Sequence, residues 1–167
     1  TQVQHQLEKV TILFAGDSGD GIQLTGTQFT TNTALFGNDL STFPDFPAEI
    51  RAPLGTVAGV SGFQINFGAV DVYTPGDLCD VLVVMNVAAL KKNLTRLKER
   101  GTIILNTAGF DKRNLRLAGV EEGQNPLLNN SLEGYKVHEF DITKLTRESL
   151  KDSSLGTKDR DRCKNMF

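Results

Sequence analysis

The chain of 167 residues has the length of one domain, and its 39% hydrophobic and 23% charged residues are ordinary for a globular protein. A formal net charge of −2 argues against a nucleic-acid-binding protein, and no apolar run approaches the ~18 residues of a membrane span. Residues 1–6 are polar and do not form a signal peptide, so we expect a cytoplasmic protein without a membrane segment.

Residues 10–15 are apolar on both faces, which predicts a strand buried in a parallel sheet. Residues 22–36 predict a helix that ends at Gly37-Asn38. Six apolar residues of this helix are expected to be buried: Ile22, Leu24, Phe29, Ala34, Leu35 and Phe36. Three prolines then fall within ten residues, which predicts a short strand over 40–43 followed by an ordered loop.

Residues 59–72 alternate between apolar and polar side chains, which predicts a half-exposed strand. Residues 81–85 form a second buried strand, and Asn86 is the expected N-cap of a helix that Gly101 ends. Residues 102–105 complete a right-handed strand–helix–strand unit. The basic residues of the central helix are interpreted as a solvated face: Lys91, Lys92, Arg96, Lys98 and Arg100.

Residues 107–136 predict turns and one short helix packed over the sheet edge, and a small basic cluster there, which includes Arg113, could meet phosphates. A last strand over 137–142 and a helix over 143–150 follow, and residues 161–167 look like the start of a helix that has been cut. The predicted fold is α/β and Rossmann-like, with a mostly parallel sheet, helices on both faces and some antiparallel strand character around 60–67.

The two cysteines, Cys79 and Cys163, are too few for an iron–sulfur cluster or an all-thiolate zinc site, each of which takes four thiolates. Both are expected to be reduced thiols, and Cys79 is expected to act as a small hydrophobe beside a buried strand. No Ser–His–Asp or Cys–His pairing is recognisable. We therefore predict no catalytic residue and no metal ligand in this chain.

The strongest local motif is the glycine loop, residues 16–21, between the first strand and the first helix. Its candidate ligand-facing residues are Gly16, Asp17, Ser18, Gly19 and Gly21. The spacing is neither the dinucleotide GxGxxG nor a P-loop, and Asp17 and Asp20 would repel a pyrophosphate unless a cation intervened. Two interpretations stay open: a turn capped by Asp or Ser, and a loop that contacts an anion or cofactor in the assembled protein.

The triplet Gly19-Asp20-Gly21 also resembles the start of a thiamine-diphosphate motif, which requires Asn-Asn about 24–30 residues later. The corresponding window, residues 43–51, contains no asparagine. We therefore reject a thiamine site in this chain.

The second motif is the proline loop, residues 46–53, in which Glu49 and Arg51 project to the same side of an extended backbone. A carboxylate and a guanidinium on a stiff loop could bind a polar ligand or pair with a partner subunit. The alternative is a surface salt bridge of about 0–1 kcal/mol.

The sequence resembles the γ-type domain of the 2-oxoacid:ferredoxin oxidoreductases over nearly its whole length. Residues 15–26 and 47–53 carry the resemblance, and residues 56–65 and 158–167 extend it. In the 2-oxoglutarate-type enzymes this domain is fused to the N-terminal side of the α subunit. Ala52 departs from the family pattern, which usually has glycine at that position.

The resemblance implies that residues 1–167 are a domain truncated from a longer α subunit. It implies a part in the coenzyme A-dependent oxidative decarboxylation of a 2-oxoacid, 2-oxoglutarate by preference, to acyl-CoA. Thiamine diphosphate, Mg and [4Fe–4S] clusters are expected in other parts of the enzyme. The expected partners are the remaining domains of the α subunit, a thiamine-binding β subunit and ferredoxin as electron acceptor. The isolated domain is expected to be inactive.

The resemblance also implies that the glycine loop and the Glu49–Arg51 segment are interface or ligand-facing elements. Two other functions stay open at this point. One is a free-standing nucleotide-binding domain of a dehydrogenase, against which the absent GxGxxG counts. The other is a subunit-interaction module that contacts no ligand.

Overall fold

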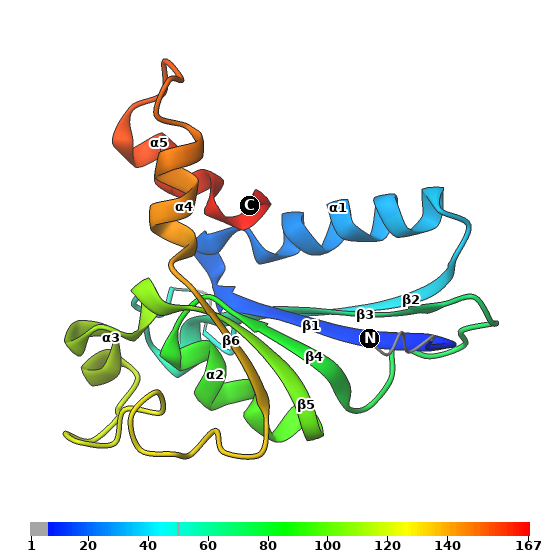
Figure 1. Cartoon of the computed structure of the whole chain (residues 1–167), viewed down its shortest axis with the longest axis horizontal. Coiled ribbons are helices and arrows are strands. Elements are labelled where there is room, and N and C mark those ends of the chain that lie inside the picture. Colours follow the sequence, from blue (N-terminus) through cyan, green and yellow to red (C-terminus); the bar gives the residue numbers. More distant parts are fainter. Residues whose placement is uncertain (1–6, 50) are drawn as a thin grey trace, which may run out of the picture.

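A computed structural model describes residues 7–49 and 51–167, and these form a six-stranded sheet with helices on both faces (Figure 1). The strand order is β2-β3-β1-β4-β5-β6. The strands are β1 (Lys9–Asp17), β2 (Asp39–Asp45), β3 (Val60–Gly68), β4 (Cys79–Val84), β5 (Leu97–Asn106) and β6 (Lys136–Phe140). The helices are α1 (Ile22–Leu35), α2 (Val87–Asn93), α3 (Lys112–Leu117), α4 (Ile142–Ser149) and α5 (Thr157–Arg162).

The sheet is mixed in the way that the sequence predicts. β1, β4, β5 and β6 pair in parallel, whereas β3 pairs antiparallel with both β1 and β2. Because β1 and β2 are both antiparallel to β3, they run in the same direction. The carboxyl ends of β1, β2, β4, β5 and β6 therefore meet at one edge of the sheet, here called the carboxyl edge. The predicted α/β fold is confirmed.

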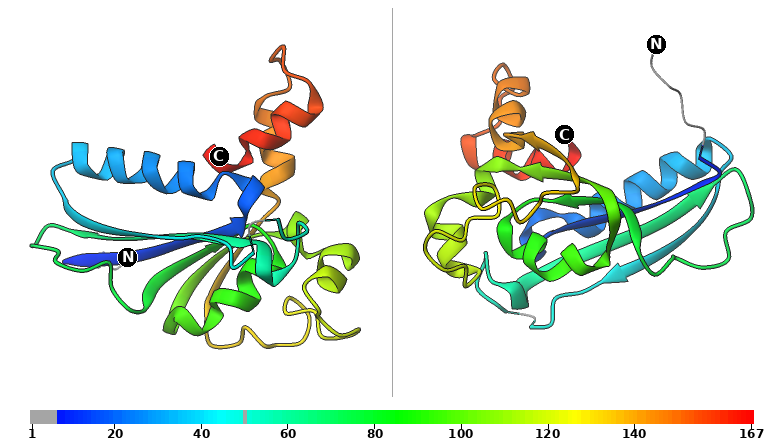
Figure 2. Two further views of the ribbon diagram at one scale, coloured as in Figure 1. Left: turned by 180° about the vertical axis from the view of Figure 1, so that it is seen from behind. Right: turned by 60° about the horizontal axis from the view of Figure 1, so that its bottom comes forward.

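The first two helices cover opposite faces of the sheet (Figures 1 and 2). α1 packs on β1, β2 and β3, and α2 packs on β1, β3 and β4. The α2 face holds the larger core, which contains Leu13, Leu82 and Ile103, each fully buried. The α1 face holds a smaller one around Ile65. No helix among the described residues is long and apolar enough to cross a membrane.

β3 is a buried strand, so the prediction of a half-exposed strand is wrong. Gln64 and Asn66, expected to face solvent, are almost fully buried because β3 lies between two strands and between two helix layers. The loop after β3 accepts their amide protons: Gln64 Nε2 donates to Pro75 O at 2.8 Å, and Asn66 Nδ2 donates to Thr74 O at 2.9 Å. Satisfied hydrogen bonds make this burial tolerable.

The central helix begins as predicted but ends earlier. Asn86 caps α2, with its side chain accepting a hydrogen bond from Ala89 N at 2.9 Å. The helix gives way to a 3-10 turn at Leu94, and β5 already begins at Leu97, so Gly101 lies inside a strand. Leu97 is buried at the start of β5. An apolar residue at helical spacing can also be the first buried residue of a strand, and the predicted helix is therefore too long.

Three of the later elements follow the prediction closely. One short helix, α3, occurs between residues 107 and 136, and β6 and α4 lie within two residues of their expected bounds. The predicted helix start at residue 161 is wrong, because α5 begins at Thr157 and ends at Arg162, and a 3-10 turn over Cys163–Met166 follows.

α1 buries only part of the predicted set. Ile22 is buried and Phe29 packs against the smaller core, as predicted, whereas the other four residues are exposed: Leu24, Ala34, Leu35 and Phe36. Gly26 and Thr33, which the prediction does not include, are buried in their place. The helix contacts the sheet through Gly26, which allows the Phe63 ring of β3 to approach its backbone. This close approach sets the rotation of the helix and leaves the apolar residues at its end facing outward.

Gly26→Ala tests that contact, because a Cβ at this position would overlap the Phe63 ring. We expect the substitution to lower the free energy of unfolding by about 1–3 kcal/mol, measured by urea denaturation. The matched control is Thr27→Ala, on the exposed side of the same helix, with an expected change within about 0.5 kcal/mol. Equal stability of the two variants would contradict the packing of α1 through Gly26.

Candidate functional site

The glycine loop lies at the point where the chain changes faces of the sheet. α1 leaves β1 toward one face, and α2 leaves the neighbouring strand β4 toward the other (Figure 1). Open α/β sheets bind ligands in the crevice that such divergent connections create at the carboxyl ends of the strands. The glycine loop therefore occupies the place where a ligand site is expected on topological grounds.

The loop is a capped turn. Ser18–Asp20 forms one 3-10 turn, and the Asp17 N–H donates to Asp20 Oδ2 at 2.9 Å. Gly21 has a φ of 71°, a left-handed conformation that favours glycine, and it leads directly into α1. Ser18 and Gly19 are exposed at the tip. The capped-turn interpretation is thus confirmed, while ligand contact stays a prediction.

A hydrogen bond joins the glycine loop to the residues that follow the proline loop. The Gly55 N–H donates to Asp17 Oδ2 at 3.0 Å, and this bond is buried. A Cβ at Gly19 would lie 3.7 Å from Leu54 Cδ2, so the tips of both segments are also neighbours. The structure therefore brings together two motifs that are some 30 residues apart in the sequence.

The C-terminal 3-10 turn lies against the start of α1, a contact that the sequence analysis missed. Lys164 Nζ is 2.7 Å from Asp20 Oδ1, and Thr25 Oγ1 donates to Asn165 O at 3.0 Å. Asn165 Nδ2 donates to Gly21 O at 3.4 Å. Figure 1 shows the C-terminus beside the first turn of α1. No local pattern around residues 163–166 indicates this position, because the contact forms over 140 residues of intervening sequence.

The two carboxylates of the glycine loop, Asp17 and Asp20, have different surroundings. Lys164 supplies a cation beside Asp20. Burial raises the pKa of Asp17 above its ordinary value of 3.8, and the Asp20 carboxylate adds to the shift, while the Gly55 N–H opposes it. Among the described residues, Asp17 Oδ1 has no hydrogen-bond partner. The expected repulsion of an anionic ligand is therefore weakened at Asp20.

A small polar cavity of about 120 Å³ lies beside this loop at the carboxyl edge. Asp17 and Asp20 line it from the glycine loop, Asn86 and Asn106 from the ends of β4 and β5, and Lys164 from the C-terminal turn. Asn106 is occupied in holding the start of α4, since its Oδ1 accepts from Ile142 N at 3.0 Å. The cavity thus presents hydrogen-bonding groups from four segments at one place.

Glu49 and Arg51 are both exposed on the proline loop, and Ile50 between them lies outside the described residues. No ion pair joins Glu49 to Arg51 in the part of the chain that the structure describes, which does not support the surface-salt-bridge alternative. The Glu49 N–H donates to Ala58 O at 3.2 Å, so the loop closes on itself. A ligand-binding role for either side chain stays a prediction.

The cysteines do not form a site together. Cys79 is fully buried in β4, and burial raises the pKa of its thiol to about 11, which keeps it protonated. Cys163 is half-buried in the C-terminal turn. Within residues 7–49 and 51–167, no three His, Cys, Asp or Glu side chains are grouped so as to hold a metal ion.

Comparison with known proteins places the chain in a family. Residues 11–167 match the family model described as pyruvate ferredoxin/flavodoxin oxidoreductase. The chain belongs to this family. It is 51% identical to the 2-oxoglutarate oxidoreductase subunit KorA of Mycobacterium tuberculosis, an alignment that covers 98% of this chain and 25% of that protein. It is 29% identical to the ketoisovalerate oxidoreductase subunit VorA of Methanothermobacter marburgensis, over 89% of this chain and 32% of that protein.

Solved structures of the family share the fold. The 2-oxoglutarate:ferredoxin oxidoreductase from Magnetococcus marinus, solved with 2-oxoglutarate, coenzyme A and succinyl-CoA bound, aligns with a TM-score of 0.67 at 23% identity, over 96% of this chain and 23% of that one. The γ subunit of a keto/oxoacid ferredoxin oxidoreductase from Geobacter sulfurreducens aligns with a TM-score of 0.60 at 18% identity, over 94% of this chain and 71% of that one. The chain spans about a quarter to a third of the length of the curated relatives that it matches.

The buried Asp17 carboxyl gives the site a measurable pH signature. Because its pKa is raised in the folded state, the folded protein holds this proton more tightly than the unfolded chain does. The stabilisation is full below the ordinary value of 3.8 and is lost as the pH rises through the raised pKa. Asp17→Asn should therefore gain stability relative to wild type as the pH rises above the ordinary value of 3.8, measured by urea unfolding over a range of pH values. A difference that is constant over this range would contradict the raised pKa.

Proposed function

We propose that this chain is the γ-type domain of the α subunit of a 2-oxoacid:ferredoxin oxidoreductase, and that 2-oxoglutarate is the 2-oxoacid. In this role it contributes to the coenzyme A-dependent oxidative decarboxylation of the 2-oxoacid to acyl-CoA. The family membership and the 51% identity to a 2-oxoglutarate oxidoreductase subunit support this proposal. They favour it over a free-standing nucleotide-binding domain, whose GxGxxG the chain lacks.

In this proposal the glycine loop and the Glu49–Arg51 segment form one wall of the coenzyme A site. The observation that carries it is the bond from Gly55 N–H to Asp17, which joins both segments at the carboxyl edge. The exposed Ser18 and Gly19 offer backbone close to a ligand, and the Arg51 guanidinium offers a cation suited to phosphate. Lys164 beside Asp20 weakens the repulsion that the Asp20 carboxylate would exert on the phosphates of coenzyme A.

The chemistry of electron transfer belongs to other parts of the enzyme. Thiamine diphosphate, Mg and [4Fe–4S] clusters do not fit this chain, because it has two separate cysteines and lacks the asparagines of a thiamine motif. We assign them to the remaining domains of the α subunit and to a thiamine-binding β subunit, with ferredoxin as the electron acceptor. The isolated domain is then inactive, and a cytoplasmic location stays a prediction.

The outer face of α1 supports packing against the remaining domains. Residues 21–38 contain no charged side chain, although half of the residues of α1 are exposed. Leu35 and Phe36 are among the most exposed large apolar residues of the chain. Depletion of charge together with exposed aromatic and aliphatic side chains is typical of protein–protein interfaces. We therefore expect this face to be covered in the assembled enzyme.

Arg51→Gln in the assembled enzyme tests the ligand-facing role. Loss of a charge-assisted contact should raise the KM for coenzyme A about tenfold or more, while the KM for 2-oxoglutarate changes little. The matched control is Arg100→Gln. Arg100 is an exposed arginine near the amino end of β5, and its replacement should leave the KM for coenzyme A unchanged. Unchanged KM values in the Arg51 variant would favour a subunit-interaction module that contacts no ligand.

A further inference from the structure

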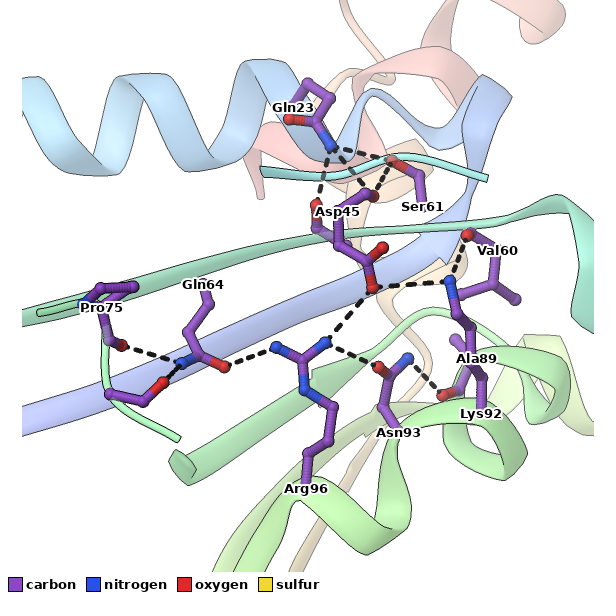
Figure 3. A network of polar contacts seen from close by, with 12 residues as sticks. Gln23, Asp45, Val60, Ser61, Gln64, Pro75, Ala89, Lys92, Asn93 and Arg96 are labelled. Atoms are coloured by element: carbon purple, nitrogen blue, oxygen red, sulfur yellow. Dashed lines mark hydrogen bonds and ion pairs between the residues drawn. The ribbon is translucent and has the colours of Figure 1, made fainter. Parts of the chain in front are cut away.

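Asp45 is the last residue of the edge strand β2 and stands directly before the proline loop. Two cations on the α2 face of the sheet form ion pairs with its carboxylate (Figure 3). Arg96 Nη1 lies 3.2 Å and Lys92 Nζ 3.5 Å from Asp45 Oδ2, and the three side chains are each about one-quarter exposed. The prediction that Lys92 and Arg96 belong to a solvated face is therefore wrong, since both turn toward β2 and β3.

The two cations are themselves held by β3. Arg96 Nη2 donates to Gln64 Oε1 at 2.9 Å, and Lys92 Nζ donates to Val60 O at 3.1 Å. Gln64 is fixed in turn by the Pro75 carbonyl. The cations are thus anchored to β3, and their contact with Asp45 ties the edge strand to the two layers beside it.

The same residue is held from the opposite face. Gln23 Nε2 in the first turn of α1 donates to Gly62 O at 2.7 Å and reaches Asp45 O at 3.5 Å. Ser61 Oγ also donates to Asp45 O, at 3.4 Å. Figure 3 shows Gln23 above and Arg96 below the strand that carries Asp45. An edge strand has a partner on one side only, so contacts from both helix layers replace the missing neighbour.

Asp45 and Gly55 lie on either side of the residues Glu49 and Arg51 and hold this part of the chain on the sheet. Among the described residues of segment 49–58, the Glu49, Ala52 and Thr56 N–H groups donate within the segment, whereas the Gly55 N–H donates to Asp17. Asp45 fixes the start of the loop, and the Gly55 bond to Asp17 fixes its end. The segment that carries Glu49 and Arg51 lies between these anchors.

We propose that Asp45, through Lys92 and Arg96, is a positioning residue that holds the Glu49–Arg51 segment beside the glycine loop. Its effect on coenzyme A rests on the proposed function, whereas its effect on the loop does not. Replacing Asp45 by asparagine keeps the size of the side chain but removes the charge that both cations share. The loop then loses its first anchor while the Gly55 anchor remains.

The test compares Asp45→Asn with wild type in the assembled enzyme by hydrogen–deuterium exchange. Amides over residues 49–58 should exchange at least about fivefold faster in the variant, with β4 and β5 unchanged. Asp45→Glu, which retains the carboxylate, should restore most of the protection. The matched control is Lys98→Gln, which breaks a 2.7 Å ion pair with Asp80 near the amino ends of β4 and β5 and should leave residues 49–58 unaffected.

Steady-state kinetics on the same variants separates the inference from the proposed function. Faster exchange together with a KM for coenzyme A raised about threefold or more, at nearly constant kcat, supports both. Faster exchange with an unchanged KM supports the positioning role and contradicts the ligand-facing role of the loop. Unchanged exchange over residues 49–58 overturns the inference whatever the kinetics show.

Discussion

The arrangement of the site depends on one buried hydrogen bond, from the Gly55 N–H to the Asp17 carboxylate. This bond connects the end of β1 to the segment that follows the edge strand, across the carboxyl edge of the sheet. It is the hydrogen bond that joins the glycine loop to the residues after the proline loop. Its acceptor is buried and has a raised pKa, so the fold uses a carboxyl group here at an electrostatic cost.

The topology is the reason that we expect a ligand at the carboxyl edge, between β1 and β4. β1 and β4 are neighbours whose following helices leave toward opposite faces, so the carboxyl edge stays open between them. Polar groups from the glycine loop, the ends of β4 and β5, and the C-terminal turn converge on it. α1 begins at this edge, and its uncharged outer surface extends from there along one face of the sheet (Figure 1), consistent with a domain that packs against others.

Local patterns predicted most of the fold, because buried strands and capped helices leave strong signals over a few residues. Asn86 caps α2 as its position indicates, and the apolar runs at 10–15 and 81–85 are buried strands. The burial of Gln64 and the rotation of α1 escaped prediction, since each depends on a partner distant in sequence. Both candidate loops were located, but their connection through Gly55, the clamp on Asp45 and the place of Lys164 arise only from tertiary contacts.

We propose that this chain forms one wall of a site whose chemistry is carried out by cofactors bound elsewhere. The most direct measurement is a structure of the assembled enzyme with coenzyme A bound. We expect the glycine loop or the Arg51 guanidinium to lie within hydrogen-bond distance, about 3 Å, of the bound coenzyme A. Coenzyme A bound with neither loop in contact, or a nicotinamide or flavin held by this domain itself, would contradict the account.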